Sequence, residues 1–153
     1  IPAGDGHSVV KQSDLPTNDA GFIKTNDFSQ VLFDKEGEAD ATMPTNIYAV
    51  GDIASLEGYD WRAKQGHVAE VMARNVAHNI MQRELGQTNF KGYHEHLNIL
   101  CIMDSGDGAA FVYRDEKRAF MFPMPLIGHW LKKGWGVYCR YSKLGKIPRI
   151  PGM

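Results

Sequence analysis

The strongest constraint on the fold is a helical repeat of apolar residues in the middle of the chain. Between residues 62 and 85, apolar side chains recur at spacings of three and four, at Val68 or Ala69, Met72, Val76 and Ile80. This spacing places them on one side of an α-helix, and the polar residues fall on the other sides. Gly86 follows, and glycine is favoured directly after a helix. The sequence therefore predicts one long helix over residues 62–85.

The segment before this helix has the pattern of short strands and turns. Residues 21–25 and 30–33 are β-like, and we expect no helix anywhere in residues 1–46. The compact apolar run 46–50 is followed by Gly51. This pattern predicts a buried strand that ends where the backbone must approach another group closely.

The segment after the helix predicts a small antiparallel sheet and a second helix. Two β-like runs, 97–102 and 109–113, flank a glycine-rich turn and predict a hairpin. Residues 117–122 could add a third strand. An amphipathic helix is predicted over residues 126–144, and Pro148 ends regular structure beyond it. The expected fold class is α+β.

Length and composition restrict the class of protein. The 153 residues fit one domain, or one core with a small appendage. The first residues contain no initiator Met, basic region or apolar signal core, so we expect a part of a longer protein. No stretch approaches the roughly 18 uninterrupted apolar residues of a spanning helix. With only Cys101 and Cys139, the chain is not a small disulfide-stabilised scaffold.

Basic residues are concentrated at the C-terminal end. Residues 117–153 contain eight of the 17 Lys and Arg residues and none of the 18 Asp and Glu residues. A basic, aromatic-rich segment indicates an anionic surface as its partner, either lipid headgroups or nucleic acid. The alternative is a solvated basic helix without a partner.

A strand followed by Gly51, Asp52 and a helix predicts a site for a polar ligand. The carboxylate can accept hydrogen bonds from hydroxyl groups, and the start of the helix supplies N–H donors. Residues 47–52 are similar to the second FAD-binding motif of the pyridine nucleotide-disulfide oxidoreductases, which contain two Rossmann-like dinucleotide-binding domains. The resemblance implies that residues 1–86 end an FAD-binding domain. It places Gly51 and Asp52 at the ribityl chain, and Lys64 and Gln65 at the pyrimidine end of the flavin.

A second resemblance begins at Cys101. Residues 101–112 are similar to the segment of sulfide:quinone oxidoreductases that carries their last redox cysteine. A cysteine in an apolar strand is usually an inert core residue, but the resemblance implies that Cys101 is catalytic. Its thiolate would hold sulfur as a persulfide and pass electrons to FAD. A further cysteine would come from an earlier part of the protein, so residues 1–153 alone should be inactive. Cys139 matches no redox position.

The C-terminal unit, expected over residues 87–153, has the composition of a bilayer interface. It mixes aromatic residues, methionines and lysines. The resemblance implies a monotopic anchor on a membrane, such as a prokaryotic inner membrane, with quinone near Phe122, Trp130, Lys132 and Trp135. A homo-oligomer is also compatible with the sequence. The alternative is a core-facing helix with solvated lysines.

Three other functions compete with sulfide oxidation by quinone. A type II NADH dehydrogenase shares FAD and the membrane anchor but does not need Cys101. A flavocytochrome sulfide dehydrogenase subunit passes its electrons to haem. A basic module binding nucleic acid through residues 117–153 would need solvent-facing aromatic side chains, and we predict no nucleic-acid partner. His94 and His96 are expected at the surface, without a metal.

Overall fold

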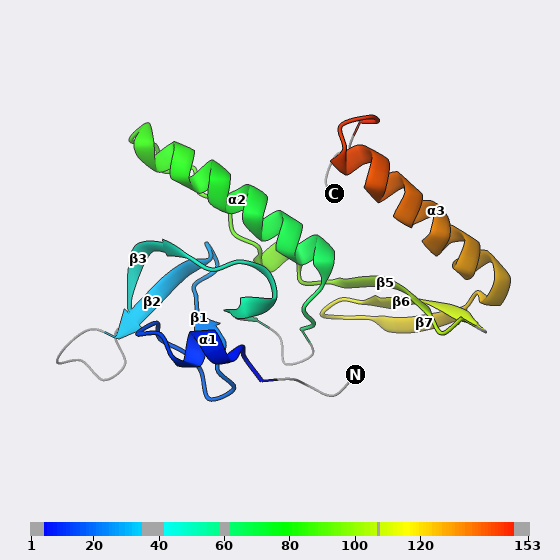
Figure 1. The fold of residues 1–153 in the computed structure, drawn as a ribbon, viewed down its shortest axis with the longest axis horizontal. Coiled ribbons are helices and arrows are strands. Elements are labelled where there is room, and N and C mark those ends of the chain that lie inside the picture. Colours follow the sequence, from blue (N-terminus) through cyan, green and yellow to red (C-terminus); the bar gives the residue numbers. More distant parts are fainter. Residues whose placement is uncertain (1–4, 35–41, 59–61, 107, 149–153) are drawn as a thin grey trace. The chain divides into compact units, whose positions relative to one another are not determined.

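The chain forms two compact units in a computed structural model that describes residues 5–34, 42–58, 62–106 and 108–148 (Figure 1). The first unit spans Ile1–Leu97 and the second spans Asn98–Met153. The sequence placed the boundary after Gly86, whereas the structure groups residues 87–97 with the first unit. Helices and small sheets are mixed, as expected for the α+β class.

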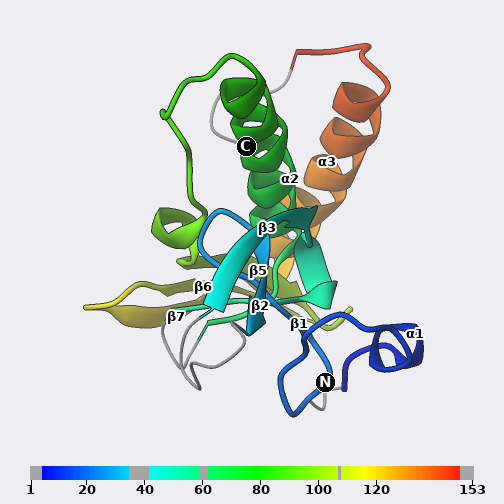
Figure 2. The same ribbon diagram turned by 90° about the vertical axis from the view of Figure 1, so that its left-hand side faces the viewer.

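The first unit contains two pairs of short strands. Strand β1 (Ile23–Lys24) pairs in parallel with β4 (Ala54–Ser55), and β2 (Gln30–Asp34) pairs antiparallel with β3 (Thr42–Tyr48). Figure 2 shows β2 and β3 side by side. The two β-like segments before residue 34 are therefore confirmed.

The expectation of a buried strand at residues 46–50 was only partly right. The segment does enter β3, but the side chain of Ile47 is 47% exposed. Among the described residues, β3 pairs only with β2, and the exposure of Ile47 shows that one face of this small sheet is open at that position. Burial resumes at Ala49, which follows the strand and reaches the core.

The expectation of no helix in residues 1–46 was wrong, because α1 spans Ser8–Lys11. The His7 side chain accepts a hydrogen bond from the Val9 N–H at 3.4 Å, and Val10 is buried. A four-residue helix is a single turn and shows no periodicity in the sequence. It forms because its start is capped and one apolar side chain enters the core.

The long helix α2 spans Gly66–Glu84, so it begins four residues later than predicted and ends where expected. Gly86 has a φ of +66°, a conformation that glycine adopts without steric cost. Its N–H donates to the Arg83 carbonyl at 3.0 Å, and the Gln87 N–H donates to the Gln82 carbonyl at 2.8 Å. These two bonds satisfy carbonyl groups at the end of the helix.

The buried side of α2 changes from apolar to polar along its length. Val68, Val71 and Met72 are buried near its start, whereas Asn79 and Gln82 are buried near its end and Ile80 is exposed. The Asn79 amide donates to the Lys91 carbonyl at 2.9 Å and accepts from the Lys91 N–H at 2.8 Å. The apolar repeat correctly predicted the helix but not the residues that its second half buries.

The core of the first unit lies between α2 and the short strands. Tyr93 and Leu97 are almost fully buried in it, which explains why residues 87–97 belong to this unit. The other members are apolar side chains from the strands, from the residues directly after β3 and β4, and from α1 and α2: Val10, Ile23, Val31, Ala49, Ala54, Leu56, Val68, Val71 and Met72. A short 3-10 helix, η2 (His94–His96), separates Tyr93 from Leu97.

The second unit is a three-stranded antiparallel sheet followed by a helix. Strands β5 (Ile99–Asp104), β6 (Ala109–Arg114) and β7 (Ala119–Pro123) lie in this order, and helix α3 spans Pro125–Lys143. The predicted hairpin, third strand and C-terminal helix are confirmed. Gly128 of α3 lies against β5 and β6, where an added Cβ would be 2.7 Å from the Ala109 Cβ. This close contact brings the first turn of α3 against the sheet.

Candidate functional site

The predicted flavin site lies where a 3-10 turn meets the start of α2. The turn, η1, spans Gly51–Ile53 and contacts α2. Gly51 has a φ of +73°, and an added Cβ would be 3.4 Å from the Ala69 Cβ. The Asp52 side chain is exposed beside this turn. The backbone therefore turns sharply against the helix and leaves a carboxylate accessible to a ligand.

Lys64 is held against the same turn. Its ammonium group donates to the backbone carbonyl of Asp52 and lies 3.1 Å from the centre of the Phe22 ring. Desolvation lowers the pKa of Lys64, and the nearby Asp52 charge partly opposes this shift. The ammonium therefore makes contacts within the unit and is not simply extended into solvent.

The start of α2 supplies hydrogen-bond donors next to this turn. Gln65 is the N-cap residue, and its carbonyl accepts from the Ala69 N–H at 3.1 Å. The Gln65 side chain makes no capping hydrogen bond to this helix start. An added Cβ at Gly66 would meet nothing within 4 Å, so there is space beside the first turn. An accessible carboxylate and the N–H donors of a helix start fit the hydroxyl-rich chain and electron-rich edge of a flavin.

Cys101 lies in a shallow pocket of the second unit. The pocket has a volume of about 670 Å³ and is lined mainly by β5, β6 and β7, with Lys132 contributed by α3. Cys101 is a half-buried free thiol and pairs across the sheet with Val112. The structure thus brings the predicted catalytic cysteine and one predicted quinone-site lysine to a common pocket.

The strand register places Cys101 on one face of the sheet and the α3 contact on the other. Side chains alternate along β5, so Cys101 and Met103 point to the face opposite Ile102. Gly128 packs near Ile102, since an added Cβ would lie 3.7 Å from the Ile102 Cγ2 atom. The thiol is therefore on the face of the sheet that the first turn of α3 leaves uncovered.

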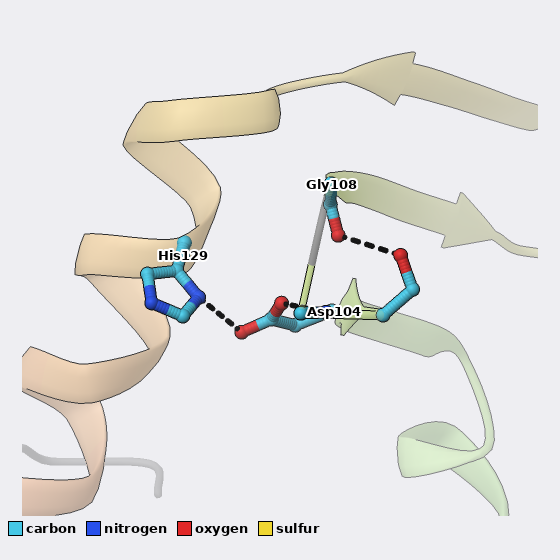
Figure 3. Close-up of polar contacts among 5 residues, drawn as sticks. Asp104, Gly108 and His129 are labelled. Carbon is cyan, nitrogen blue, oxygen red and sulfur yellow. Dashed lines mark hydrogen bonds and ion pairs between the residues drawn. The ribbon is translucent and has the colours of Figure 1, made fainter.

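Asp104 and His129 form a hydrogen-bonded pair that sequence reasoning missed. The His129 Nδ1 and Asp104 Oδ2 atoms are 2.9 Å apart (Figure 3). The Gly106 N–H is the main cause of a lowered pKa at Asp104, and His129 and Lys132 lower it further. The two residues are 25 positions apart, and only the packing of α3 on the hairpin brings them together.

The apolar side of α3 faces solvent within the described residues. A shallow groove of about 540 Å³ runs along it, lined by Leu126, Ile127, Trp130, Leu131, Trp135 and Tyr138. Trp130 is 69% exposed, which disagrees with a core-facing helix in this unit. Of the residues predicted to lie near quinone, Trp130 and Trp135 both line this groove. Lys132 lines the Cys101 pocket, and Phe122 is exposed on β7 outside both.

Among the described residues, no three His, Cys, Asp or Glu side chains are grouped closely enough to bind a metal ion. His94 and His96 are exposed. No helix in the described ranges has the length and apolar character needed to cross a membrane.

Comparisons with known proteins do not assign the chain to a family. No protein-family model matches it, and no curated protein matches its sequence. The function must therefore be argued from the geometry of the two units and from the sequence resemblances.

Proposed function

We propose that this chain is the C-terminal part of an FAD-dependent oxidoreductase that transfers electrons from sulfide to a membrane quinone. The observation that carries the proposal is that Cys101, a half-buried free thiol, lines an open pocket. A half-buried thiol can react only if a small substrate reaches it, and the pocket provides access. Lys132 also lines this pocket, from the side of the sheet that carries α3, and its positive charge favours the approach of an anion such as hydrosulfide.

The first unit supplies part of the cofactor site in this proposal. Asp52 would accept a hydrogen bond from a ribityl hydroxyl of FAD, and the N–H groups at the start of α2 would bind the electron-rich edge of the flavin. Gly51 allows the close turn that exposes Asp52. Lys64 and Gln65 flank the helix start. When bound, FAD supplies a carrier that accepts two electrons and releases them to quinone.

Cys101 carries the sulfur chemistry. In the oxidised protein it forms a disulfide with a cysteine of the longer protein. Hydrosulfide attacks this bond, so that one cysteine becomes a persulfide and the other leaves as a thiolate. The persulfide then passes its outer sulfur to a second sulfide or another thiol, which leaves both cysteines as thiolates. Re-formation of their disulfide releases two electrons, and FAD, when bound, would carry this pair to quinone. Serine at this position cannot carry out the reaction, because its hydroxyl is far less acidic than a thiol.

Helix α3 places the protein at a membrane surface. Its apolar groove enters the interfacial region of the bilayer, and Lys133, Arg140 and Lys143 contact anionic headgroups. Peripheral attachment gives access to a quinone without a spanning helix. Trp130 and Trp135 suit the depth of the lipid headgroups.

The same exposed aromatic residues satisfy one requirement of the nucleic-acid alternative. A basic module would stack bases on Trp130 and Trp135 and bind phosphates through its lysines. Binding nucleic acid would not require the Cys101 pocket. A type II NADH dehydrogenase would likewise leave this cysteine without a catalytic role, and a flavocytochrome subunit would deliver electrons to haem.

The decisive experiment replaces Cys101 with serine in the longer protein. Cys101→Ser should reduce sulfide-dependent quinone reduction by orders of magnitude and keep FAD bound with a nearly native spectrum. Cys139→Ser, in the other free cysteine, is the matched control and should retain activity. Equal sulfide oxidation by Cys101→Ser and its parent would refute the catalytic role. If the parent oxidises NADH and ignores sulfide, the dehydrogenase alternative is correct.

A further inference from the structure

The carboxylate of Asp104 is fixed by two hydrogen bonds. Its Oδ1 atom accepts from the Gly106 N–H at 2.9 Å, and its Oδ2 atom lies 2.9 Å from the His129 Nδ1 atom (Figure 3). The first bond belongs to the turn between β5 and β6, and the second joins this turn to α3. The hairpin turn therefore holds the Asp104 carboxylate in position independently of the imidazole.

This geometry determines which nitrogen of His129 carries the proton in the neutral ring. The pKa of Asp104 is lowered, so its side chain is a carboxylate at neutral pH and can only accept hydrogen bonds. Nδ1 must then be the donor. In the neutral ring Nε2 is the basic atom, and in the protonated ring Nε2–H is the proton that can be transferred.

His129 neighbours the apolar groove of α3 through Trp130 and does not itself line it. Its ring packs edge-on against Trp130, with ring centroids 6.3 Å apart and planes at 77°. Trp130 lines the groove, whereas Gly128 contacts the sheet. The His129 side chain is 33% exposed, so its free nitrogen can exchange protons with water. Asp104 of β5 is hydrogen-bonded to His129, and Lys132 of α3 is near enough to Asp104 to help lower its pKa.

We propose that His129 donates protons to the quinone as it is reduced, and that Asp104 is its positioning residue. This inference rests on the proposed function, because quinone takes up two electrons and two protons to become quinol. In each transfer, the Nε2–H bond of the imidazolium breaks and an O–H bond forms on the quinone. The neutral ring then takes a proton from water. The electrons come from FAD in the proposed reaction, so only protons pass through His129.

One experiment measures the two half-reactions separately in the longer protein with bound flavin. Sulfide reduces the flavin anaerobically, and a water-soluble ubiquinone analogue then reoxidises it in a stopped-flow instrument across a range of pH. His129→Asn keeps an N–H donor for Asp104 and removes Nε2. We expect the sulfide step to change less than twofold and the quinone step to fall by about 10²- to 10⁴-fold. Added imidazole should restore part of the quinone step.

Control measurements separate this proposal from the proposed function. His96→Asn, in an exposed histidine of the first unit, should leave both half-reactions unchanged. Flavin reduced photochemically allows the quinone step to be measured even if sulfide is not the donor, so failure of the sulfide step affects only the proposed function. A quinone step in His129→Asn with the parent's rate and pH profile would overturn the proton-transfer role. The proton-transfer role would also be overturned if the photoreduced flavin of the parent protein did not react with quinone.

A second measurement tests Asp104 without relying on turnover. Imidazole ¹⁵N shifts of this chain should identify the neutral His129 ring as protonated at Nδ1. Asp104→Asn should move the proton toward Nε2 and should slow the quinone step, while the amide oxygen can still accept from Gly106. A parent ring that is protonated mainly at Nε2 would contradict the role of Asp104.

Discussion

Replacing Gly128 with alanine should weaken the attachment of α3 to its sheet. The new Cβ would lie 2.7 Å from the Ala109 Cβ and 3.3 Å from the Met124 Cβ. Both neighbours are bound directly to the backbone and cannot rotate away, so α3 must shift. Overpacking of this kind costs about 1–3 kcal/mol. Alanine also favours the helix by about 1 kcal/mol relative to glycine, which opposes the loss.

Gly134→Ala is the matched control, because it lies in the same helix and an added Cβ would meet nothing within 4 Å. It should gain the same helix propensity without the packing cost. The propensity therefore cancels between the two variants, and the difference of about 1–3 kcal/mol reports the contact at Gly128 alone.

Hydrogen exchange of the α3 amides can measure this difference. A detached α3 with three glycines should not remain helical by itself, so detachment exposes its amides. At constant pH, the α3 amides of Gly128→Ala should exchange about 5- to 150-fold faster than those of Gly134→Ala. Equal protection in the two variants would show that the sheet accommodates the methyl group and that Gly128 is not needed for the close approach.

Three other predictions concern the proposed ligands and the pH dependence. Asp52→Ala in the longer protein should weaken FAD binding by about 1.5–3 kcal/mol, measured as a dissociation constant, with unchanged affinity as the contrary result. Truncation after Pro125 should abolish binding to anionic vesicles, and Lys133→Gln should weaken this binding by about 1 kcal/mol at low salt. Equal co-sedimentation of the intact and truncated proteins with vesicles would show that the membrane anchor lies elsewhere. The lowered pKa of Asp104 stabilises the second unit above the unfolded aspartate pKa of about 4, and this contribution is lost as the pH falls through the folded pKa. Urea titrations followed by tryptophan fluorescence should therefore show a smaller loss of stability in acid for Asp104→Asn than for the parent.

The elements with strong local patterns could be predicted from the sequence. The repeat through Val68 and Met72 identified α2, and Gly86 located its end. The hairpin was predictable because two β-like runs flank glycines, one of which, Gly106, adopts a φ of +93°. These signals depend on residues close together in the chain, so they remain visible without any tertiary structure.

The candidate sites were only partly predictable, because their contacts depend on distant segments. The presence of Lys132 in the Cys101 pocket depends on how α3 crosses the hairpin, and the sequence placed this lysine with Trp130 instead. The Asp104–His129 pair depends on the same crossing. The burial of Asn79 could not be predicted for another reason. A polar residue interrupts an apolar repeat, although here both the N–H and the oxygen of its amide are hydrogen-bonded when buried.

The polar end of α2 has a consequence for how this protein can evolve. Asn79 binds the N–H and carbonyl groups of Lys91, and the Asn75 amide binds the Gly92 carbonyl at 2.8 Å. All of these partners are main-chain atoms, which every residue except proline provides. The exposed side chain at position 91 can therefore vary between descendants of this sequence, but the asparagine at position 79 cannot. At position 91 the helix therefore fixes the path of the chain without constraining the side chain, whereas position 92 requires glycine because an added Cβ would clash with the Asp27 carboxylate.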